Sequence, residues 1–445
     1  MPRDWLLHLR RDVTIRRVAQ QAGLLYVSGL LTTVLTLGQQ LSTAALLGVS
    51  DYGRLATIAA TSTLILLLLD VRTWELGTKL LSEDASTRDV ESGRVITRLA
   101  SIELGLGALA GALLLVLANP LATHLLKDPE LATAVRVACI ALPIRLLSQG
   151  VCVALLRLEE RYGWLAVRSV VAAALRLLLM SGAAFLGFGV TGVVAASVIA
   201  EFVSATILVA VILPTHHRVA GDHPLIDLRK PRNWSEHRRM LRTLWVSASL
   251  KGFQLETFVP LAAALTSPAQ VGLLRVGLDV ASVTSRVTAP LAIVLSPRIV
   301  ASLRAGDRRA SVRLLRQSNA ALIALVAPVA VLLLLCTAWL LPSLAPEAHG
   351  ITPVAMLLTI GMAVNAVSQW VRPAVVGLGI VREQNRLSLL LTALSLGALV
   401  LGTLAFDSVG AASAMAAFLV LYALFSAHLV VRRLGGFAIL SLRSK

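Results

Sequence analysis

Long apolar runs are the feature that most constrains the fold of this chain. The runs are about 18 to 25 residues long, the length that an α-helix needs to cross about 30 Å of hydrocarbon. Only 15% of the residues are charged, whereas soluble proteins carry about 25%. We therefore expect an all-α polytopic membrane protein.

Twelve such runs predict about 12 transmembrane helices in two pseudo-repeated six-helix bundles. The predicted spans are 20–47, 55–78, 97–118, 133–156, 165–187, 190–213, 243–265, 269–297, 318–341, 351–378, 387–406 and 409–431. The predicted parts are a cytoplasmic N-terminal arm (1–19), an N-terminal bundle (20–213), a basic cytoplasmic loop (214–242), a C-terminal bundle (243–431) and a cytoplasmic tail (432–445).

The two predicted bundles show a weak similarity in sequence at their first outer turns. Segment 47–53, with the expected turn at 48–53, ends one span and leads into the next, and segment 265–272 does the same in the second half. Paired six-helix halves are a recurrent plan of transporters, whose pathway lies between the halves. This pattern favours transport over catalysis.

The distribution of basic residues predicts the orientation in the membrane. Most of the 41 Lys and Arg residues fall in alternate connections, whereas the opposite connections hold only Arg54 and Lys127. Basic residues gather on the cytoplasmic side of membrane proteins. We therefore expect both termini to be cytoplasmic in an inner (plasma) membrane protein, and we assign the net charge of +17 to topology rather than to nucleic acid.

The predicted eighth span carries three charged residues on nearly one face. Arg275, Asp279 and Arg286 point within about 40° of one another at 100° per residue. Arg275 and Asp279 stand four residues apart and can pair along the helix. Arg286 then adds positive charge to this face, unless Arg275 and Arg286 lie at the two ends of the span and extend toward the interfaces.

Ionisable residues inside spans are functional candidates, because a charge in the bilayer centre costs about 2.5–3.5 kcal/mol on insertion scales. Arg145 is deep enough to need a partner, for which Glu201 is a candidate. The candidates for a cationic, substrate-binding cavity are Arg286, Lys251, Arg275 and Arg372. The supporting candidates are Asp279, Glu256, Gln39, Arg72 and Glu75. Gln39 also fits helix–helix hydrogen bonding, and Arg72 with Glu75 also fits a salt network at the cytoplasmic rim.

The excess of basic over acidic residues in the spans favours an anionic cargo. The chain has no Gly-x-x-x-x-Gly-Lys-Ser/Thr phosphate loop and no His-Glu-x-x-His zinc helix. Its three cysteines lie in apolar stretches, and the histidines of 214–242 match no metal framework. We expect no cofactor, no metal and no catalytic residue, so the chain is not expected to be an enzyme.

Several short motifs resemble polysaccharide flippases of the Wzx type. These are the O-antigen and exopolysaccharide translocases of the multidrug/oligosaccharidyl-lipid/polysaccharide exporter superfamily. The motifs are LLGVSDYG at 46–53, LGT at 76–78, VGLLR at 271–275, SPR at 296–298 and GD at 306–307. One departure is the segment 71–75, which intervenes where such proteins often carry Asp-x-Gly.

The resemblance implies a flippase for a polyprenyl-pyrophosphate-linked oligosaccharide in lipopolysaccharide or exopolysaccharide biosynthesis, working by alternating access. The implied partners are this lipid-linked oligosaccharide and membrane lipids, and the resemblance leaves open the polysaccharide polymerase machinery. A basic cavity suits a pyrophosphate, because Arg binds phosphate oxygens in a forked geometry.

Three rival functions remain open. A peptidoglycan lipid-precursor flippase would normally have two further spans. A drug/cation antiporter of the same superfamily should have an acidic, aromatic-rich cavity, whereas aromatic residues make up only 4% of this chain. A membrane glycan ligase or polymerase would need a sizeable outer loop, and the predicted outer loops are short.

Overall fold

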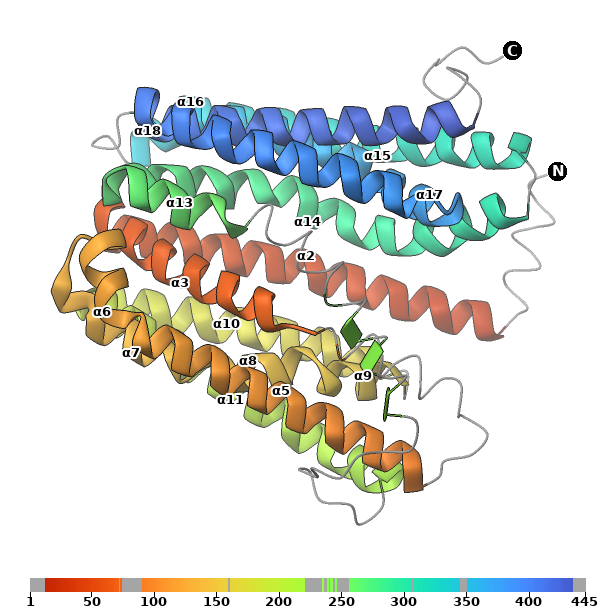
Figure 1. The fold of residues 1–445 in the computed structure, drawn as a ribbon, viewed down its shortest axis with the longest axis horizontal. Coiled ribbons are helices and arrows are strands. Elements are labelled where there is room, and N and C mark those ends of the chain that lie inside the picture. The colour runs from red at the N-terminus through yellow and green to blue at the C-terminus, as the bar shows by residue number, and fades with distance from the viewer. Residues whose placement is uncertain are drawn as a thin grey trace. The chain divides into compact units, whose positions relative to one another are not determined.

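The computed structural model describes most of the chain as α-helix (Figure 1). The described residues are 13–71, 73, 90–158, 161–220, 234–235, 238–239, 241–242, 245, 256–305, 308–344 and 350–434. No strand occurs among them. The chain divides into two compact units, unit 1 (Met1–Pro260) and unit 2 (Leu261–Lys445).

Unit 1 is a bundle whose long helices are α2 (Val13–Leu47), α3 (Val49–Leu69), α5 (Val90–Val116), α10 (Tyr162–Phe185) and α11 (Gly189–Ala220). Helix α10 packs against both α2 and α11 (Figure 1). The outer turn expected at 48–53 is wrong, because α2 ends at Leu47 and α3 begins at Val49. Gly48 alone makes the turn with φ of 80°, a conformation that favours glycine.

The predicted fourth span is broken into three helices, which the apolar pattern did not indicate. They are α7 (Ala132–Cys139), α8 (Leu142–Gln149) and α9 (Val151–Leu158). Helix α8 packs against α5. A Cβ at Gly107 of α5 would lie 2.4 Å from Cα of Pro143, so this close approach requires glycine.

A buried carboxylate compensates the break between α8 and α9. Glu103 of α5 is 1% exposed, and its two oxygens accept hydrogen bonds from the backbone N–H of Val151 at 2.9 and 3.1 Å. Thr73 Oγ1 donates to the same carboxylate. The first N–H groups of a helix lack intrahelical partners, and a carboxylate there is favoured by the helix dipole.

Unit 2 is built around α14 (Pro268–Arg304), which packs against α15 (Arg308–Leu344), α16 (Ile351–Val367), α17 (Val371–Gly377) and α18 (Val381–Arg433) (Figure 1). The short helix α13 (Phe258–Leu265) precedes it and crosses the boundary between the units. Ser267 caps α14, because its Oγ accepts from Gln270 N at 3.4 Å, and Pro268 occupies the first turn, where its missing N–H is not needed.

Element α18 contains the last two predicted spans, 387–406 and 409–431, as two arms. The arms meet at Phe406 and Asp407, whose backbone is not helical, with φ of 49° at Asp407. The carboxylate of Asp407 accepts from Thr266 Oγ1 at 2.8 Å. A hydrogen bond of 2.7 Å between Gln384 Nε2 and Ser426 Oγ joins the two arms, so the chain reverses at the kink.

The described part of the chain contains nine helices long and apolar enough to cross a membrane. This number counts α18 once although it holds two predicted spans. Helix α14, which carries Arg275, Asp279 and Arg286, is not among the nine. The predicted span 243–265 lies mostly outside the described residues. The chain is therefore a multi-pass, all-α membrane protein, and the repeat relation between its two bundles stays a prediction.

Gly150→Ala is expected to destabilise unit 1. A Cβ at this position would lie 1.5 Å from Glu103 Oε1, so the carboxylate must leave the Val151 N–H. A buried group without its partner costs about 1–3 kcal/mol. The midpoint of thermal unfolding of the purified protein in detergent should fall. Gly105→Ala on α5, where an added Cβ meets no atom within 4 Å, is the matched control, and equal midpoints for both variants would contradict this account.

Candidate functional site

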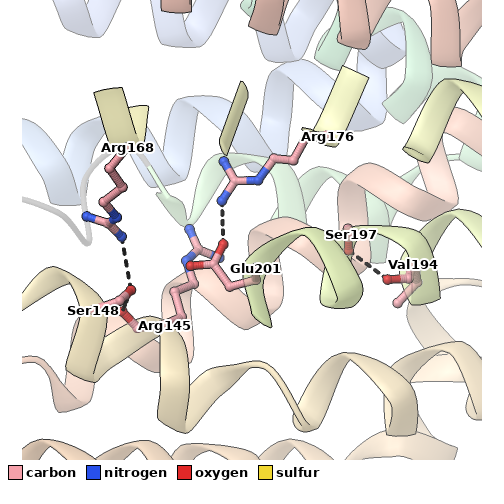
Figure 2. A network of polar contacts seen from close by, with 7 residues as sticks. All are labelled: Arg145, Ser148, Arg168, Arg176, Val194, Ser197 and Glu201. Carbon is pink, nitrogen blue, oxygen red and sulfur yellow. Dashed lines mark hydrogen bonds and ion pairs between the residues drawn. The ribbon is translucent and has the colours of Figure 1, made fainter. Parts of the chain in front are cut away.

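Four charged side chains of unit 1 lie between three helices of the bundle. Arg145 belongs to α8, Arg168 and Arg176 belong to α10, and Glu201 belongs to α11 (Figure 2). We call these four residues the arginine cluster. A charge inside a transmembrane bundle requires a partner, a hydrated cavity or a function.

Glu201 is the acidic centre of the arginine cluster. Its side chain is 7% exposed, and its Oε2 forms an ion pair with Arg176 Nη2. The guanidinium of Arg145 lies beside the same carboxylate (Figure 2) and is attracted to it and to Glu256. The sequence indicated Glu201 as a partner for Arg145, but the ion pair that forms joins Glu201 to Arg176.

Arg168 ties α10 to the short helix α8. Its Nη2 donates to Ser148 Oγ at 3.1 Å, and that hydroxyl donates to the carbonyl oxygen of Arg145 at 3.0 Å (Figure 2). The sequence did not single out Arg168, which lies near the start of its helix. Its spacing of eight residues from Arg176 could have indicated that the two arginines belong to one site. On one helix this spacing places the two side chains about 80° apart around the axis and about two turns apart along it.

In unit 2, α14 forms the ion pair that the spacing of its charges predicted. Arg275 Nη2 lies 3.1 Å from Asp279 Oδ1, and Arg275 Nε donates to Oδ2 at 3.2 Å. The Asp279 side chain is 3% exposed. This two-point contact neutralises Arg275 along its own helix, which is the geometry of a strong Arg–carboxylate pair.

The other cationic candidates of unit 2 lie on neighbouring helices. Arg286 is half-buried on α14, and Arg372 is exposed on α17, and these two helices pack together. Thr288, two residues after Arg286, accepts from Gln369 Nε2 at 2.9 Å. Residues two positions apart lie about 200° apart around a helix, so this hydrogen bond belongs to the side of α14 away from Arg286.

The remaining candidates divide into described and undescribed residues. Gln39 is buried on α2 and donates to Thr43 Oγ1 at 3.2 Å, which accounts for it within its own helix. Glu256 lies in unit 1 and attracts Arg145. The candidates Lys251, Arg72 and Glu75 lie outside the described residues.

The histidine, cysteine and acidic side chains of the described ranges form no group of three that could hold a metal ion. Cys139 and Cys152 are buried and Cys336 is exposed. The chemistry that the described clusters offer is electrostatic: guanidinium groups, held by carboxylates and hydroxyls, can bind an anion through charge-assisted hydrogen bonds.

Solved structures that resemble this chain include membrane transporters. An inward-facing multidrug resistance transporter of the MATE family, in the MOP superfamily, has a TM-score of 0.67 at 14% identity, covering 93% of this chain and 98% of that chain. The lipid II flippase MurJ, in an inward closed conformation, has a TM-score of 0.71 at 11% identity, covering 91% and 87%. A MOP superfamily transporter from Pyrococcus furiosus has a TM-score of 0.62 at 14% identity, covering 94% and 95%.

These identities are low, so the three likenesses show the fold alone. Among curated proteins, none matches the sequence significantly. The sequence itself matches a family model described as polysaccharide biosynthesis protein over residues 18–303, which is more than half of the chain. The fold of a MOP superfamily transporter and this match agree, and the chain belongs to the polysaccharide biosynthesis protein family.

Proposed function

We propose that this protein flips a polyprenyl-pyrophosphate-linked oligosaccharide across the inner membrane during lipopolysaccharide or exopolysaccharide biosynthesis. The single observation that carries the proposal is the match of residues 18–303 to the polysaccharide biosynthesis family. The fold supports it, because the similar solved structures include a lipid II flippase. Transport would proceed by alternating access, in which two arrangements of the bundles expose one binding region to each side in turn.

The charge pattern of α14 supports an anionic cargo. Both oxygens of Asp279 contact Arg275, and Arg286 follows seven residues later on nearly the same face of the helix. We assign to Arg286 the main contact with the pyrophosphate, with Lys251, Arg275 and Arg372 as further cations. The lipid tail would stay in the bilayer while the head group passes along these charges.

The proposed orientation places both termini and the loop 214–242 in the cytoplasm. We expect reporter fusions after residue 230 and at the C-terminus to be active only with a cytoplasmic reporter, because Lys and Arg concentrate in these segments. A fusion after Lys127 should show the opposite activity. A periplasmic signal from the loop 214–242 would refute the orientation.

Arg286→Ala is expected to reduce glycan export without reducing the amount of protein in the membrane. A charge-assisted contact contributes about 1.5–3 kcal/mol, so transport of the lipid-linked substrate should fall about tenfold or more. Arg286→Lys should restore part of the activity, because an ammonium keeps the charge but loses the planar fork. Export of surface glycan is measured together with membrane abundance.

The matched control is Arg304→Ala at the exposed C-terminal end of the same helix. This variant should export glycan normally.

Asp279→Ala should behave differently from Arg286→Ala, because it releases Arg275 from its ion pair and leaves a half-buried cation. Normal export by Arg286→Ala at normal abundance would leave Arg286 as an anchor at the membrane interface.

A further inference from the structure

The arginine cluster of unit 1 contains two arginines, Arg145 and Arg168, that the ion pair between Arg176 and Glu201 does not account for. We propose that Arg145, Arg168 and Arg176 form a second anion site that takes a diphosphate group, and that the carboxylate of Glu201 occupies the place of this anion until it binds. The inference rests on the proposed function only for the natural source of the diphosphate, a polyprenyl lipid.

The charge balance of the cluster is the first argument. The guanidiniums of Arg145 and Arg176 lie at the Glu201 carboxylate, and that of Arg168 lies at Ser148 (Figure 2). Glu256 adds a second negative charge that attracts Arg145. Among these described residues, three positive charges therefore face two negative ones. A purely structural ion-pair cluster inside a bundle needs equal numbers of positive and negative charges, because each unbalanced charge removed from water is strongly unfavourable. An entering anion reduces this imbalance.

The backbone around Arg145 supplies the second argument. Helix α8 (Leu142–Gln149) carries Arg145 and Ser148 and lies between two interruptions of the predicted fourth span, one before Leu142 and one at Gly150. Substrate and ion sites of transporters are typically formed at discontinuous membrane helices. The interruptions of this span therefore coincide with the residues that gather the guanidiniums.

An unsatisfied donor is the third argument. Arg145 Nε is buried and has no hydrogen-bond partner within the described ranges. A buried donor without a partner is costly to leave in place. A phosphate oxygen is a strong acceptor for such a group, and the neighbouring guanidinium of Arg168 is already oriented by its hydrogen bond to Ser148.

Arg176 is the more exposed partner of its ion pair. The Arg176 side chain is 42% exposed, whereas that of Glu201 is 7% exposed. Arg176 uses one nitrogen, Nη2, for Glu201, although a guanidinium presents five donors. A diphosphate can therefore approach Arg176 from the exposed side and replace Glu201 as its acceptor, while Glu201 stays beside Arg145.

The test measures binding of inorganic pyrophosphate to the purified full-length protein in detergent. We expect saturable binding that Arg145→Gln, Arg168→Gln and Arg176→Gln each weaken about tenfold or more. Arg176→Lys should bind with an intermediate affinity. Arg136→Gln is the matched control, because Arg136 is exposed on α7 and donates to Asn119 Oδ1 at 3.0 Å, away from the cluster; its affinity should equal that of the wild type.

Glu201→Gln separates the proposal from a purely structural ion pair. Removing the competing carboxylate should strengthen pyrophosphate binding about tenfold, which misfolding cannot produce. Size-exclusion profiles and thermal midpoints identify variants that do not fold. Unchanged or weaker binding by folded Glu201→Gln, or an equal loss in Arg136→Gln and Arg176→Gln, would overturn the proposal.

Two further ligands identify the source of the anion. Farnesyl diphosphate that binds more tightly than inorganic pyrophosphate, with the same dependence on the variants, supports a lipid-linked diphosphate; equal affinities support a free anion in the same site. Displacement of pyrophosphate by phosphatidylglycerol vesicles at matched phosphate concentration would overturn the assignment to a diphosphate. A deletion strain with normal glycan export would overturn the proposed function alone, since binding is measured without oligosaccharide.

Discussion

The arrangement of this protein depends on the cost of holding charge inside an apolar helical bundle. The buried carboxylates Glu201, Asp279 and Glu103 are each matched by a specific partner: Arg176, Arg275 and the Val151 N–H, respectively. Each of these contacts fixes one helix against another or against its own next turn. The packing of both units therefore follows from electrostatic matching as well as from apolar area.

Helix interruptions provide the second organising element. The fourth predicted span breaks at Gly150, where Glu103 accepts from the exposed backbone N–H, and the last element reverses at Asp407, whose carboxylate accepts from Thr266. In an apolar environment every backbone polar group needs a partner, so an interruption is stable only where a side chain supplies it. In unit 1 the interrupted span also carries Arg145, so the break and the arginine cluster occur together.

The two units differ in how their basic residues are arranged around a buried carboxylate. In unit 2, Arg275, Asp279 and Arg286 lie along one helix, α14, with Asp279 engaged by Arg275. In unit 1 the three arginines come from two helices, α8 and α10, and two of them, Arg145 and Arg176, lie at Glu201 of α11 (Figure 2). Under the proposed alternating access, a diphosphate would meet cations in both bundles, and the competing carboxylate in unit 1 would keep its binding reversible, as transport requires.

The sequence by itself determined the fold class, the positions of most spans, the family resemblance and the Arg275–Asp279 pair. These features are local: a run of apolar residues sets a span, and a spacing of four places two side chains on one helical face. Its weakest predictions were the span ends and turns, such as the turn at 48–53 that Gly48 makes alone. Only the tertiary structure decided the contacts of Glu103 with Val151 and of Arg176 with Glu201, which join residues 48 and 25 positions apart. Such pairs depend on which helices are neighbours and how far each is rotated about its axis, and apolar patterns that fill a helix on all sides leave that rotation undetermined.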